Sequence, residues 1–142
     1  MRKFVLLLAA VGVLSVTASA LAGTHGASWS AKLTAAQEIP KQMVKAPAAN
    51  GAFTATLSGN KLKWKLTFSK LTGSATAAHI HLGAKGKAGN VLIPLCGPCK
   101  SGVSGTAAVN GAAMKDFTKR LLYVNVHTAK NPSGEIRGQL GG

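Results

Sequence analysis

Three of the four histidines stand in stretches whose spacing could build a metal site. His79 and His81 are two residues apart, so a β-strand places both imidazoles on one face. His127 lies near the end of a second alternating stretch, from residue 122 to 128. Neutral imidazoles from two strands can hold Cu, Zn, Ni or Fe. The alternative is that these are half-buried histidines bonded to the backbone or to charged neighbours, and spacing alone leaves both interpretations open.

The two cysteines form the motif Cys96-Gly97-Pro98-Cys99, which has the same four residues as a thioredoxin active site. A redox-active pair of this kind opens a helix, which lowers the pKa of the first thiol. The residues that follow, 100–105, are rich in Gly and Ser and do not predict a helix. We therefore expect a small structural disulfide, with thiol exchange and metal ligation as less favoured alternatives.

The charge is strongly one-sided, with 17 Lys and Arg against three acidic residues and a net charge of +14. A surface of this kind attracts polyanions, such as anionic glycans, lipid headgroups or DNA, although the lysines could also serve solubility alone. The candidate anion-binding residues lie in one alternating stretch and one Gly-rich loop: Lys61, Lys63, Lys65, Lys85 and Lys87. Three carboxylates are too few for a calcium cage.

The N-terminus predicts a secretory signal peptide over residues 1–22. Arg2 and Lys3 precede an uncharged run rich in Leu, Val and Ala, and Ala20-Leu21-Ala22 fits a cleavage site. No later stretch is apolar enough to span a membrane. We expect a secreted or periplasmic protein with a flexible lead-in at 23–30 and one domain at 31–142, of unknown oligomeric state.

The elements that must position these residues are short β-strands separated by turns rich in Gly. The expected strands are 28–33, 51–57, 61–68, 76–82, 91–95, 103–109, 121–128 and 135–140, with one helix at 110–120. Gly59-Asn60 predicts a hairpin turn between the second and third strands. This pattern is typical of an all-β sandwich or barrel.

Two function classes receive little support from the sequence. No nucleophile-elbow motif is present, which argues against a hydrolase. No helix-turn-helix, zinc finger or basic helix indicates sequence-specific binding of nucleic acid.

The chain resembles the CHRD domain family, first named from chordin. The resemblance rests on three motifs that span most of the chain: LTAAQEIP at 33–40, AHIHLG at 78–83, and LYVNVHT at 122–128, which continues as NPSGEIRGQL at 131–140. Lys41 departs from the family, which often has a second proline after Pro40.

The resemblance implies a Greek-key, immunoglobulin-like fold similar to Cu/Zn superoxide dismutase. On that similarity, His79, His81 and His127 correspond to copper ligands, while the zinc half-site has no counterpart. The stretch between His81 and Val103 contains neither His nor Asp. Glu135 and Arg137, two apart in a strand, are expected to support the site, together with Glu38.

Two functions follow as hypotheses. The first is a non-catalytic extracellular or envelope module with a binding or structural role, for which anionic glycans or envelope surfaces are the candidate partners. The second is a mononuclear copper protein that buffers copper or reacts with superoxide, and enzymatic activity is left open.

Overall fold

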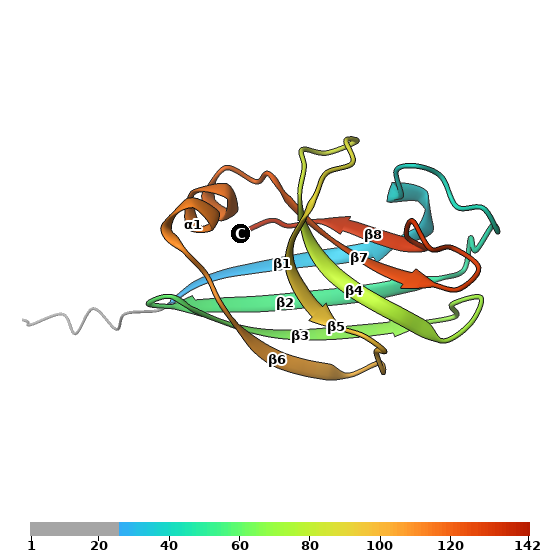
Figure 1. Cartoon of the computed structure of the whole chain (residues 1–142), viewed down its shortest axis with the longest axis horizontal. Coiled ribbons are helices and arrows are strands. Elements are labelled where there is room, and N and C mark those ends of the chain that lie inside the picture. Colours follow the sequence, from blue (N-terminus) through green and yellow to red (C-terminus); the bar gives the residue numbers. More distant parts are fainter. Residues whose placement is uncertain (1–25) are drawn as a thin grey trace, which may run out of the picture.

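The computed structural model describes residues 26–142. The expected signal peptide and His25 lie outside these described residues. Eight antiparallel strands and one α-helix form the domain (Figure 1). The strands are β1 (Ala27–Thr34), β2 (Asn50–Ser58), β3 (Lys61–Ser69), β4 (Ala75–Leu82), β5 (Val91–Cys96), β6 (Val103–Ala108), β7 (Leu122–Thr128) and β8 (Ile136–Gln139).

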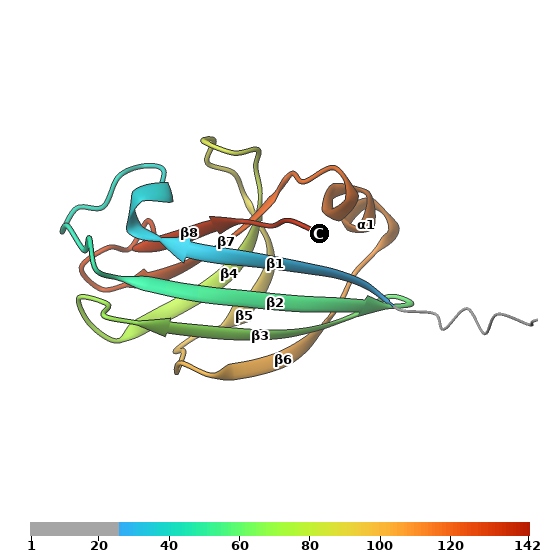
Figure 2. The same cartoon turned by 180° about the vertical axis from the view of Figure 1, so that it is seen from behind.

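The strands hydrogen-bond in the order β5-β4-β7-β8-β1-β2-β3-β6. The sheet curves so that its two edges, β5 and β6, approach each other beneath the other strands (Figures 1 and 2). β4 pairs with β5, and β5 lies beside β6 where the two edges of the sheet approach each other. β6 in turn pairs with β3, so these four strands form a Greek-key arrangement. The predicted all-β fold with a single short helix is confirmed.

Alternating side chains fill the interior of this curved sheet. In β3, every second residue from Leu62 to Leu66 is buried, while the lysines before and between them are exposed. The hairpin turn at Gly59-Asn60 sets the register so that Phe53 of β2 faces Leu66 of β3. Apolar burial on one face of each strand provides the main driving force for this closure.

The helix α1 (Gly111–Thr118) covers one end of the interior. The Asn110 side chain accepts a hydrogen bond from the Ala113 amide at 2.9 Å and so caps the helix. The Phe117 ring packs against Trp29 of β1, with centroids 4.8 Å apart. β1 begins at Ala27, so residues 27–30 of the expected lead-in belong to the sheet.

Three loops fold over the outer face of β4, β7 and β8. They are the β4–β5 loop (83–90), the segment from the 3-10 turn Ala35–Gln37 to residue 49, and the β7–β8 loop (129–135). Arg137 of β8 donates to the carbonyl oxygens of Ala84 and Lys87 in the first loop. Within residues 26–142, no helix has the length and apolar character to cross a membrane.

Candidate metal centre

The outer face of β4 and β7 carries the three histidines singled out by the sequence. β4 and β7 pair so that His81 lies opposite Tyr123 and His79 opposite Asn125. The alternate residues, among them Ile80 and Val124, point into the apolar interior. Strand alternation therefore places His79, His81 and His127 together under the three loops.

One potential ligand nitrogen from each histidine lies within 4.8 Å of the others. Two nitrogens bound to one ion at about 2.0–2.1 Å can be at most about 4 Å apart, so small rotations of the rings would close the set. His81 and His127 are 7% and 9% exposed, whereas His79 is half-buried. The cluster is therefore accessible to solvent mainly from the side of His79.

Backbone hydrogen bonding fixes the tautomer of His81. Its Nδ1 donates to the carbonyl oxygen of Gly89 at 2.9 Å. A carbonyl only accepts, so the proton is on Nδ1 and the lone pair is on Nε2. The buried Nε2 has no hydrogen-bond partner among the described residues. Gly89 must be glycine here, since a Cβ at this position would lie 1.6 Å from the Leu82 carbonyl oxygen.

His127 is oriented in the same way by the β7–β8 loop. Its Nδ1 donates to the Pro132 carbonyl oxygen at 2.9 Å, which leaves Nε2 as an acceptor. That Nε2 lies 3.1 Å from Nδ1 of His79. In the metal-free protein His79 therefore donates to His127. Moving this one proton to the other nitrogen of His79 frees both atoms to bind a metal.

The environment favours neutral imidazoles, the form that binds metals. Burial, assisted by the charges that His127 and His81 can carry, lowers the pKa of His79 to about 4. Burial also lowers the pKa of His81 and of His127, against the opposing effect of their backbone hydrogen bonds. All three imidazoles are therefore uncharged at neutral pH, as metal coordination requires.

Tyr123 and Arg137 form a stack behind His81. The Tyr123 ring lies 4.9 Å from the His81 ring, with only 10° between the planes. The Arg137 guanidinium lies 3.4 Å from the Tyr123 ring centroid, as in a cation–π contact. The Tyr123 hydroxyl accepts from the Gly89 amide at 3.1 Å. Tyr123 therefore contacts His81 and also holds the loop that orients it.

Glu38 is fully buried beside this stack. Burial raises the pKa of Glu38 to about 8, although the charges of Arg137 and Lys41 and a backbone hydrogen bond act to lower it. Its carboxyl group lies against Gly134, where a Cβ would come 2.5 Å from Oε1. Gly134 also has a φ of +131°, which favours glycine.

Glu135 is also fully buried but lies in a different environment. Its carboxylate accepts hydrogen bonds from Thr72, Thr128 and Asn131, which outweigh the effect of burial and lower its pKa. Glu135 precedes β8, and it does not share its partners with Arg137. It joins the end of β7 to the loop that carries Pro132.

The expected anion-binding lysines fall into two separate groups. Lys61, Lys63 and Lys65 are exposed on β3, whereas Lys85 and Lys87 belong to the β4–β5 loop. β3 and this loop lie on opposite sides of the domain (Figures 1 and 2).

The two cysteines lie at disulfide distance, with sulfurs 2.11 Å apart. The residues between and after them form a turn without a helix, and the Cys99 amide donates to the Ala75 carbonyl oxygen. The two cysteines are therefore placed as the predicted disulfide requires.

Sequence reasoning identified the histidines but missed several residues that hold them. Gly89 and Pro132 act through backbone carbonyls, for which the sequence carries no signal. Tyr123 could have been found, because alternation along β7 places it on the face of His127.

Comparison with known proteins supports the resemblance noted from the motifs. The family model described as CHRD domain matches residues 29–140. No curated protein and no solved structure matched the chain. The match includes all three histidines, the stack behind His81 and all eight strands except the start of β1, and on this ground the chain belongs to the CHRD domain family.

Proposed function

We propose that this CHRD domain is a mononuclear copper-binding module whose ligands are Nδ1 of His79, Nε2 of His81 and Nε2 of His127. The observation that carries the proposal is the convergence of these nitrogens, with two of the three tautomers set by backbone carbonyls. Metal-binding histidines in proteins are commonly oriented in this way through their second nitrogen.

Copper suits this donor set better than zinc. Copper(II) binds nitrogen ligands more tightly than zinc in the Irving–Williams order. Structural zinc sites take four protein ligands, and no carboxylate or thiol joins the three histidines in the clusters found among residues 26–142. The donor set leaves further coordination positions for water or a small ligand.

An extracytoplasmic setting fits this proposal, since the domain belongs to the CHRD family and its cysteines are at disulfide distance. Copper buffering or delivery outside the cytoplasm is the role that we infer.

A stoichiometric titration tests the proposal. Cu(II) is added to the purified protein beside a competing chelator, and the result is compared with that for His81→Ala. Both proteins carry His25→Ala, because a chain starting at Gly23 would bind Cu(II) independently through its amine, two amides and a histidine in third place.

We expect one Cu(II) per chain and a loss of at least about tenfold in affinity for His81→Ala. A His81→Ala protein that binds as tightly as its parent would contradict the proposal. So would a parent that binds no more tightly than an unstructured histidine peptide.

A further inference from the structure

A second surface lies on the outer side of β1, β2, β3 and β6, away from the histidines. All of its exposed side chains are short or basic: Ser28, Ser30, Lys32, Asn50, Ala52, Thr54, Thr56, Ser58, Lys61, Lys63, Lys65, Thr67, Ser69, Ser104, Thr106 and Ala108. None is acidic or aromatic. We refer to these residues as the Lys/Ser/Thr face.

The strand register arranges this face in rows. One row runs across four strands from Ser104 through Lys65 and Thr54 to Ser30. The next row runs from Thr106 through Lys63 and Thr56 to Ser28. Neighbouring strands are about 4.8 Å apart, and rows two residues apart along a strand are about 7 Å apart. Each of these rows therefore presents one lysine and three hydroxyl groups.

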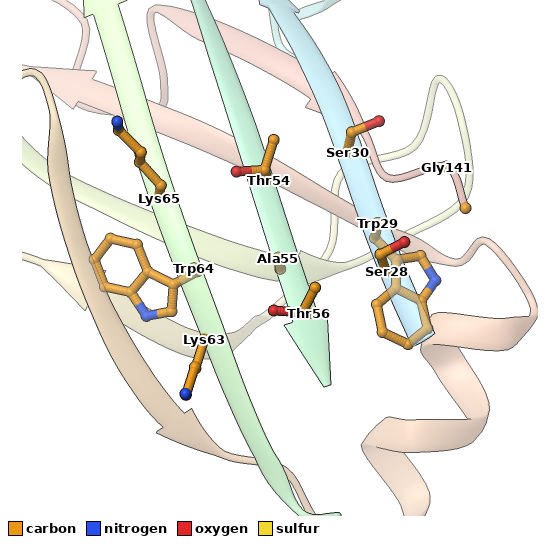
Figure 3. Close-up of a pocket in the computed structure, with 11 residues that line it drawn as sticks. Ser28, Trp29, Ser30, Thr54, Ala55, Thr56, Lys63, Trp64, Lys65 and Gly141 are labelled. Carbon is orange, nitrogen blue, oxygen red and sulfur yellow. The ribbon is translucent and has the colours of Figure 1, made fainter. Parts of the chain in front are cut away.

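The short side chains between the lysines make this face hollow. Figure 3 shows Lys63 and Lys65 on β3 beside Thr54 and Thr56 on β2, with Ser28 and Ser30 on β1. These residues line a hollow of 670 Å³, whose far rim is Gly141 and Gly142. A second hollow of 600 Å³ shares Ser30 and Thr54 with the first and continues along the strands to Lys32 and Ser69.

The charge of this face has no side-chain carboxylate to offset it. Of the acidic residues, Glu38 and Glu135 are fully buried, and Asp116 is on α1. At the rim, the Arg120 guanidinium donates a hydrogen bond to the Gly142 oxygen at 3.1 Å. A ligand lying across the rows would meet ammonium groups and hydroxyls over a length of several strands.

We propose that the Lys/Ser/Thr face binds an anionic polysaccharide, with Lys63 and Lys65 contacting its carboxylate or sulfate groups and Thr54 and Thr56 bonding its sugar hydroxyls. This ligand is independent of copper and occupies the opposite side of the domain. Single-stranded nucleic acid fits less well, because proteins hold its bases by stacking them on exposed aromatic rings. The two aromatic residues that line the first hollow, Trp29 and Trp64, are buried. Duplex DNA is read by a helix or ribbon that enters a groove, which this broad face does not offer.

The test compares binding of four probes: a heparin oligosaccharide, oligogalacturonate, single-stranded DNA and neutral dextran. The main variant is Lys63→Gln/Lys65→Gln. Its matched control is Lys85→Gln/Lys87→Gln, which makes the same change of charge in the β4–β5 loop. A third variant, Thr54→Val/Thr56→Val, removes two hydroxyls while keeping shape and charge.

We expect an anionic glycan to bind, and Lys63→Gln/Lys65→Gln to lower its affinity at least tenfold with little change in the control. Thr54→Val/Thr56→Val should lower glycan affinity severalfold without changing the binding of DNA. Equal losses in the two lysine pairs would overturn the proposal in favour of general charge attraction. Tighter binding of DNA than of either glycan would also overturn it. So would a glycan affinity that is the same in Thr54→Val/Thr56→Val as in the parent.

Discussion

The ring of Tyr123 is stacked on the imidazole of His81, with 10° between the two ring planes and centroids 4.9 Å apart. The two residues face each other across β4 and β7, and both reach Gly89, His81 through Nδ1 and Tyr123 through its hydroxyl. The stack therefore couples His81 and its strand neighbour Tyr123 to the β4–β5 loop above them.

We predict that Tyr123→Leu lowers copper affinity by about tenfold or more, because His81 loses both its stacking partner and the anchor of its loop. Tyr123→Phe keeps the ring and removes only the hydroxyl, so its loss should be smaller. Chelator competition on the two variants measures the difference. Equal affinities for Tyr123→Leu and the parent would show that the stack does not position His81.

The raised pKa of Glu38, about 8, predicts that part of the folding stability depends on pH. The folded protein holds this proton more tightly than the unfolded chain, whose carboxyl has a pKa near 4.5. The contribution is therefore fully present below pH 4.5 and is lost as pH rises toward 8. Glu38→Gln, which resembles the protonated form, should remove this loss.

Thermal unfolding of the metal-free protein from pH 4.5 to 9 tests this prediction. Glu38→Gln should be the more stable of the two proteins at the alkaline end. The lowered pKa values of the histidines act in the opposite direction below pH 6.5, so the comparison is read above that pH. If the unfolding temperatures of the two proteins change with pH in the same way, Glu38 does not titrate in this range.

Glu135→Gln should destabilise the protein by about 1–3 kcal/mol, because buried hydrogen-bond donors lose their carboxylate acceptor. The donors are Thr72, Thr128 and Asn131. Copper affinity should also fall, since Pro132 in the same loop orients His127.

Asp116→Asn is the matched control for this variant, as it makes the same chemical change on the partly exposed helix. Its unfolding free energy should change by less than about 0.5 kcal/mol. If Glu135→Gln melts as the parent does and binds copper equally well, the carboxylate has no supporting role.

Replacing both cysteines by alanine should lower the stability by about 2 kcal/mol, since a loop this short restricts the unfolded chain little. Copper affinity should be unchanged, because neither cysteine belongs to the histidine cluster. Denaturant unfolding and the titration described above measure the two effects. Intact mass after alkylation without reductant checks the bond, and two alkylated thiols would contradict it.

Alternation of apolar residues was enough to predict the strands and the face of each histidine. In β4, His79 and His81 share a face because strand geometry requires it. The pairing of β4 with β7 could not be derived in this way. It joins His81 to Tyr123 across 41 intervening positions in sequence, and only the resemblance to a family indicated it.

The residues that hold the histidines were harder to predict for a different reason. Gly89 and Pro132 supply carbonyl oxygens, which every residue has, so their role depends on loop geometry alone. Glu38 and Arg137 were expected to support the site, but the contact of Arg137 with Tyr123 depends on side-chain packing across β7 and β8. Such contacts leave no periodic pattern in a sequence.

The close approach of Gly89 to the Leu82 carbonyl means that one added methyl group would displace the β4–β5 loop. The oxygen that fixes the His81 tautomer would move with it. If the proposed copper site is right, a related chain with an alanine at this position would keep all three histidines and still bind copper poorly. For the proposed site, the glycine at position 89 is therefore as informative about metal binding as the three histidines.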